Sequence, residues 1–106
     1  MKRTAHIIVI ATCPNREMAG KLARLLVEKR LAACVQMFPI ESVYRWRGEI
    51  CQAGEIALHI KSRGELFAKI AAVIQENHPY EVPEIVQVPI TDGLPAYLDW
   101  IGDCTE

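Results

Sequence analysis

One stretch, residues 35–61, constrains the fold more than any other part of the chain. In its second half, apolar and polar side chains alternate, and Ile56, Leu58 and Ile60 share one face, which is the pattern of a half-buried strand. Its first half is rich in residues that favour strands, and Gly48 lies where a tight turn needs a positive φ. The sequence therefore predicts one long β-hairpin over residues 35–61.

The length of this hairpin has a consequence for assembly. Each strand of about a dozen residues is about 40 Å long, whereas a domain of this size has a radius of gyration of only about 13 Å. We expect the outer end to extend beyond the core and to expose Tyr44, Trp46 and Ile50 in one patch, at an interface between identical chains. The alternative is that the strands bend at Pro39 and Gly54 and fold back on their own core.

Length and composition indicate a single domain, residues 1–106, with an ordinary hydrophobic core. A net charge of −1 provides no basic surface for nucleic acid or for an anionic membrane. The apolar run at residues 7–10 is too short for a membrane span or for the core of a signal peptide. Because no signal peptide is evident, we expect the four cysteines to be free thiols in a reducing compartment, the cytoplasm. No C-x-x-C pair supports a zinc ribbon or a thioredoxin-type motif.

Strands and helices alternate along the rest of the chain. Residues 5–12 form an apolar run that is typical of a central strand, and Asn15 follows as the cap of a helix over about residues 16–30. Residues 84–90 predict another strand, and a short helix is expected to begin near Pro95.

A second helix is predicted directly after the hairpin. Ser62 and Glu65 have the spacing of a capping box, in which each side chain bonds a backbone amide of the first turn. The apolar positions that follow repeat at helical spacing, and Pro79 prevents the helix from continuing beyond His78.

This order of elements is typical of an α+β, ferredoxin-like fold, built from a double split βαβ unit. It predicts a four-stranded antiparallel sheet with both main helices on one face, a long hairpin between the second and third strands, and a short C-terminal helix. The other face of the sheet is bare in this arrangement, so the last helix or a partner subunit must cover it.

The residues suited to chemistry are few. His78, at the end of the second helix, is the candidate ligand for a divalent metal ion, and the alternative, which its spacing alone favours, is that it caps the last carbonyls of that helix. Glu81 and Glu84 could act as a carboxylate pair or line a polar rim. No phosphate-binding glycine loop, G-x-S-x-G or H-E-x-x-H motif occurs, and no nucleophile can be named. We therefore do not expect an enzyme.

Four segments carry a specific resemblance. They are LARLLVEKRLAACV at residues 22–35, SVYRWRG at 42–48, HPYEVPE at 78–84, and Tyr97-Leu98-x-Trp100. In this order they resemble the CutA divalent-cation tolerance family over nearly the whole chain. The resemblance implies a cytosolic homotrimer that is similar to the nitrogen-regulatory PII proteins, linked to copper and other divalent metals, and without established catalysis.

The resemblance also implies site residues. The family's histidine before Pro-Tyr corresponds to His78, which would bind Cu(II) or another divalent cation. Asn77 and Ala11 stand where some members have a histidine and a cysteine, and both departures weaken a copper site. The PII similarity implies a small-ligand pocket between subunits. We expect Lys61, Tyr80 and Glu84 to line this pocket.

Three other functions compete with this interpretation. A PII-like sensor of small ligands would need no direct role for metal. An enzyme of the acylphosphatase kind would need a backbone anion cradle after the first strand, and the segment Thr12-Cys13-Pro14-Asn15 is poorly suited to form one. An RNA-binding module would need exposed aromatic residues on the central strands, where this chain has aliphatic ones.

Overall fold

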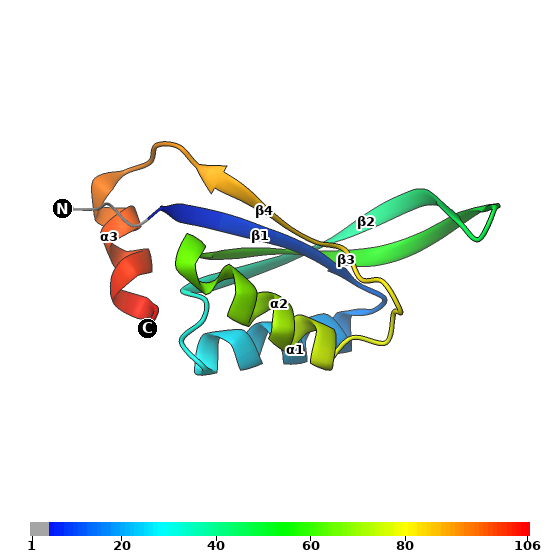
Figure 1. The fold of residues 1–106 in the computed structure, drawn as a ribbon, viewed down its shortest axis with the longest axis horizontal. Coiled ribbons are helices and arrows are strands. Elements are labelled where there is room, and N and C mark those ends of the chain that lie inside the picture. The colour runs from blue at the N-terminus through cyan, green and yellow to red at the C-terminus, as the bar shows by residue number, and fades with distance from the viewer. Residues whose placement is uncertain (1–4) are drawn as a thin grey trace.

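Four strands form one antiparallel sheet in the order β2-β3-β1-β4, as the computed structural model of residues 5–106 shows (Figure 1). This arrangement confirms the predicted α+β, ferredoxin-like fold. The elements are β1 (His6–Cys13), α1 (Arg16–Glu28), β2 (Cys34–Trp46), β3 (Glu49–Arg63), a 3₁₀ turn (Gly64–Leu66), α2 (Phe67–Glu76), β4 (Ile85–Ile90) and α3 (Pro95–Cys104).

The core lies between one face of the sheet and helices α1 and α2, which lie on the same side of it in Figure 1. Alternate residues of β1 point into it, so Val9 and Ala11 are fully buried, and α2 contributes Ile70 and Ile74. Asn15 caps α1 as expected, because its Oδ1 accepts the amide of Met18 at 2.9 Å. Within residues 5–106, no helix is both long enough and apolar enough to cross a membrane.

The hairpin extends well beyond the rest of the sheet. β2 and β3 pair without interruption from Cys34 and Lys61 to Trp46 and Glu49, whereas β1 lies beside only residues 56–63 of β3. The outer seven residues of β3, about 23 Å of strand, therefore have only β2 beside them. The molecule is 49 Å long and only 25 × 22 Å across. The predicted overhang is confirmed.

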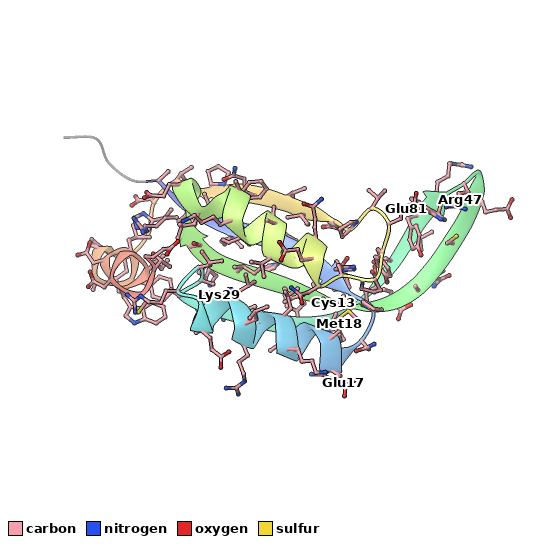
Figure 2. The ribbon with its side chains drawn as sticks, turned by 60° about the horizontal axis from the view of Figure 1, so that its bottom comes forward. Cys13, Glu17, Met18, Lys29, Arg47 and Glu81 are labelled. Carbon is pink, nitrogen blue, oxygen red and sulfur yellow. The ribbon has the colours of Figure 1, made fainter. Side chains whose placement is uncertain are left out.

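The hairpin turn explains how two such long strands stay in register. Arg47 and Gly48 form a two-residue turn with φ of 51° and 81°. Positive φ at both positions matches the right-handed twist of the flanking strands and favours glycine. The pairing runs unbroken through Pro39 and Gly54, so the strands do not fold back on the core there. They curve instead, and Figure 2 shows the tip lying beside the segment after α2.

The predicted capping box at the start of α2 is wrong. Ser62 still belongs to β3 and is fully buried, and its hydroxyl donates to the carbonyl oxygen of Leu31 at 2.6 Å. Glu65 forms an ion pair with Arg63 at 3.2 Å and does not reach back to a backbone amide. Ser62 therefore stays in the strand and does not cap the helix, because its hydroxyl donates a hydrogen bond to a buried carbonyl oxygen on a neighbouring segment.

The second face of the sheet remains open in the chain that the structure describes. α3 lies at the end of the sheet far from the hairpin tip (Figure 1), where Ile101 anchors it by complete burial. On the open face, Ile8 lies opposite Val88 and Ile10 opposite Val86, and the two valines are 43% and 47% exposed. α3 meets this face at Lys61, beside which Tyr97 lies, and it leaves Val86 and Val88 partly exposed.

Candidate functional site

A cleft of about 790 Å³ lies between the outer part of the hairpin and the segment that joins α2 to β4. Its apolar and aromatic lining residues are Val43, Tyr44, Trp46, Tyr80 and Val82. The overhang of β2 supplies the first three, and the segment at 77–84 supplies the other two. The hairpin length that was evident in the sequence is therefore what creates this cleft.

Strand pairing decides which hairpin side chains share a face. Ile40 lies opposite Glu55 and Tyr44 opposite Cys51. Because side chains alternate along a strand, Tyr44, Trp46 and Glu55 lie on the same face as the open side of the sheet. The segment at 77–84 begins where Asn77 ends α2, its Nδ2 donating to the carbonyl oxygen of Val73 at 2.8 Å.

Glu55 is the most buried charged group of the cleft, with only 9% of the residue exposed. The hydroxyl of Tyr80 donates to its Oε2 at 3.2 Å. No lysine or arginine of residues 5–106 forms an ion pair with Glu55. At the rim, by contrast, Arg47 and Glu81 form an exposed ion pair at 2.9 Å (Figure 2).

The balance of charge in the cleft is negative. Four carboxylates, from Glu41, Glu55, Glu81 and Glu84, line it together with one cation, Arg47. Since Arg47 is already paired with Glu81, three carboxylates have no cationic partner among the described residues. Such a site attracts cations and repels anions.

Two neighbouring groups respond to this environment. Burial, followed by the negative charge of Glu55, raises the pKa of Tyr80 to about 12. The same two causes raise the pKa of the Cys13 thiol to about 11. At neutral pH Tyr80 therefore stays a hydrogen-bond donor, and Cys13 stays a thiol, which is a poor nucleophile and metal ligand. All four cysteines are free, as predicted.

The raised pKa of Tyr80 predicts a late phenol titration. Absorbance of phenolate during an alkaline titration should show one tyrosine ionising near pH 12, above the ordinary value of 10, and this component should be absent from Tyr80→Phe. Because the folded-state pKa is raised, the stabilisation from Tyr80 should be complete below pH 10 and should be lost as the pH rises toward 12. Completion of the change in phenolate absorbance well below pH 12 would contradict this prediction.

His78 joins the segment after α2 to the end of β1. The backbone amide of Tyr80 donates to its Nδ1 at 3.2 Å, so the proton of a neutral ring is on Nε2, which donates to the carbonyl oxygen of Thr12 at 2.6 Å. Both ring nitrogens are therefore engaged. A metal ion could bind either nitrogen only if one of these hydrogen bonds were lost.

The environment of His78 offers few further metal ligands. Within the described part of the chain, no three histidine, cysteine, aspartate or glutamate side chains are grouped so that they could hold a metal ion. Ala11 is fully buried in the core, and Asn77 is committed to capping α2. The role of His78 as a metal ligand stays a prediction.

The predicted ligand-pocket residues fall into two places. Tyr80 and Glu84 both line the cleft. Lys61 does not: it lies six residues beyond Glu55 on β3, about 20 Å away. There its Nζ donates to Oε1 of Gln36 at 3.0 Å and lies 5.6 Å from the centre of the Tyr97 ring.

Sequence reasoning missed Glu55 as a site residue. Its position on the polar face of β3 was visible in the alternating pattern. Its burial was not, because the burial depends on the tertiary packing, which also brings in its hydrogen-bond partner Tyr80 from 25 positions away in the chain. The sequence offered only a weak indication of this site, namely a single acidic residue next to Gly54 in the long hairpin.

The three expected interface residues do not form one patch. Tyr44 and Trp46 share a face and line the cleft, whereas Ile50 lies opposite Arg45 and therefore points to the other face. The single patch is thus wrong, because the two-residue turn at 47–48 pairs Tyr44 with Cys51, and Ile50, the neighbour of Cys51, points to the opposite face. All three are exposed, Ile50 by 73%, and their role at an interface stays a prediction.

A ferredoxin-like domain with an overhanging hairpin and an acidic cleft beside it is the class of protein that these features define. A family model described as "CutA1 divalent ion tolerance protein" matches residues 7–104. The chain belongs to this CutA1 family, as its resemblance in sequence indicated.

Relatives and solved structures agree with this assignment. The chain is 43% identical to the divalent-cation tolerance protein CutA of Thermus thermophilus, over 92% of this chain and 96% of that protein. The chain is also 42% identical to the periplasmic divalent cation tolerance protein CutA of Archaeoglobus fulgidus. The solved structure of that protein matches with a TM-score of 0.94, over 95% of this chain and 99% of that one.

Longer relatives match only in part. Protein CutA of Mus musculus is 43% identical over 90% of this chain, and the chloroplastic protein CutA of Arabidopsis thaliana is 43% identical over 98%. The chain spans only 54% and 58% of the length of these two relatives. The family model and the Thermus thermophilus relative are named for tolerance of divalent ions, and no catalytic family is indicated.

Proposed function

We propose that this protein is a non-catalytic, cytoplasmic homotrimer linked to divalent-cation tolerance, which binds a metal ion and a small ligand in clefts between its subunits. The observation that carries the assembly is the sheet face that α3 leaves open, with the hairpin extending past it. Membership of the CutA1 family supports the link to divalent cations.

The open face has the properties of a surface between identical subunits. It carries partly exposed apolar side chains on both edge strands, Phe38 on β2 and Val86 and Val88 on β4, which are 38–47% exposed. The sheet also ends on two unpaired edges, β2 and β4, which offer backbone groups for further pairing. Sedimentation should give a mass near that of three chains, and a monomer at micromolar concentration would contradict the proposal.

The metal part of the proposal requires more than one chain offers by itself. The donor groups near His78 do not complete a coordination shell within residues 5–106, so other copies or water would have to supply ligands. Imidazole is suited to Cu(II) and Zn(II), which are the cations we propose for this position.

Replacing the histidine tests this part directly. His78→Ala should weaken the binding of Cu(II), measured by calorimetry, by roughly tenfold or more, and should leave the mass in sedimentation unchanged. His6→Ala is the control, because His6 lies near the start of β1, at the opposite end of the sheet. If His78→Ala binds Cu(II) with unaltered affinity, the imidazole serves only to brace the segment after α2.

A second candidate function is a sensor of small ligands, similar to the PII proteins, with no direct role for metal. The cleft of about 790 Å³ favours it, since this volume is typical of sites for small molecules. The acylphosphatase alternative gains no such support. Asn15 is used as a helix cap and Cys13 is a buried thiol, so the turn after β1 is committed to structure.

A further inference from the structure

The buried carboxylate of Glu55 is the starting point, because its charge is incompletely balanced. Its one hydrogen bond comes from a neutral phenol, that of Tyr80, and no cationic side chain of residues 5–106 forms an ion pair with it. Its Oε1 accepts no hydrogen bond from the described residues. Among these residues, every fully buried side-chain nitrogen or oxygen has a hydrogen-bond partner, so Oε1 is not fully buried. Oε1 therefore retains access to the cleft that Glu55 lines. A buried carboxylate without a cation is costly, and a bound cation would offset that cost.

The aromatic wall of the cleft provides a second, independent feature. Trp46, Tyr44 and Tyr80 line it with 37–45% of each residue exposed. The chain already places one cation on this wall: the guanidinium carbon of Arg47 lies 5.5 Å from the centre of the Trp46 ring. A tryptophan face at this distance attracts a cation, and the same attraction acts on cationic ligands.

The combination selects one class of ligand. Anions are disfavoured by the four carboxylates, and a metal ion would find no group of three ligating side chains among the described residues. A cation with an apolar body, by contrast, could place its charge at Glu55 and its body against Val82 and the aromatic rings. We propose that the cleft binds a small organic cation of the alkylammonium class.

This site does not depend on a metal ion or on His78, whose nitrogens are both engaged within the chain. The exposed ion pair between Arg47 and Glu81 would have a role in this site, because it joins the hairpin tip to the segment at 77–84 at the rim of the cleft. The bridge would hold the two walls of the cleft at a spacing suited to one small molecule.

The test uses the full-length protein in its native oligomeric state, with 2-phenylethylammonium as the probe. Calorimetry should detect its binding, and in Trp100→Phe, where Trp46 is the remaining tryptophan, the fluorescence should change on titration. The neutral isostere 2-phenylethanol should bind at least about tenfold more weakly, because it lacks the charge that Glu55 attracts. Phenylacetate should not bind.

Variants locate the site. Glu55→Gln keeps an acceptor for Tyr80 and should weaken binding of the ammonium probe at least about tenfold. Glu84→Gln lies on the exposed rim and should weaken it only about twofold to threefold, while leaving the fold intact. Glu28→Gln removes the same charge from the exposed surface of α1 and should leave the affinity unchanged.

Three results would overturn the proposal. The first is equal affinity for 2-phenylethanol and the ammonium probe. The second is loss of Cu(II) or Mg²⁺ binding in Glu55→Gln without any binding of the ammonium probe, which would make the cleft a metal site. The third is protection of Trp46 from an aqueous quencher in the native assembly together with absent probe binding, which would show that another copy of the chain fills the cleft.

Discussion

Val88→Asp is expected to prevent the proposed trimer from forming. Val88 lies on the open face of the sheet, opposite Ile8, and is 43% exposed in the single chain. If three copies cover this face, each would bury an aspartate without a cation, at a cost of roughly 3–5 kcal/mol. Sedimentation at a fixed concentration should therefore show the mass of one chain for the variant and of three for the parent.

A matched control distinguishes loss of assembly from loss of folding. Val27 is also 43% exposed, but it lies on α1, in the layer on the other side of the sheet. Val27→Asp should remain a trimer, apart from a small loss of helix stability from an acidic residue near the C-terminus of α1. If Val88→Asp still sediments as three chains, the open face is not the trimer interface.

Leu58→Ala is expected to cause the largest loss of folding stability. Leu58 is fully buried at the centre of β3, where it faces the two helices, and it is part of the main hydrophobic cluster. Removing a buried leucine side chain costs the transfer free energy of the lost atoms and leaves a cavity, together about 2–5 kcal/mol. Denaturant unfolding at one protein concentration should show this decrease in the free energy of unfolding.

Leu94→Ala is the appropriate control for this substitution. Leu94 is 71% exposed at the start of α3, so the same change of side chain should alter stability by less than about 0.5 kcal/mol. A loss for Leu58→Ala that is no larger than the loss for Leu94→Ala would mean that the packing between β3 and the helices contributes little. Measuring both variants by sedimentation separates folding from assembly.

Much of the fold follows from local patterns in the chain. The alternation in β3 and the glycine at position 48 predicted the hairpin, and its length predicted the overhang. The cap at Asn15 was correct because a cap needs only its own helix. The cap at Ser62 was wrong because a distant carbonyl, that of Leu31, is the better partner.

The candidate site was predicted only in part. Tyr80 and Glu84 are neighbours in the chain, so one segment carries both to the cleft. Lys61 and Glu55 illustrate the difficulty, because they share a face of β3 but lie about 20 Å apart. The alternating pattern predicts which face a residue lies on, but it does not predict which residues of that face belong to the same site. Likewise, the face on which Ile50 lies depends on the position of the turn, and one residue of slippage reverses it.

The sequence by itself determined the elements, their order, the long hairpin and the family, since each depends on periodicity, turn residues or contiguous motifs. Only the tertiary structure decided that Glu55 is buried beneath Tyr80, that both nitrogens of His78 are engaged, and that α3 leaves the sheet open. The physical reason is that burial and hydrogen bonding here join residues 25 and 66 positions apart, whose approach depends on the packing of the whole chain.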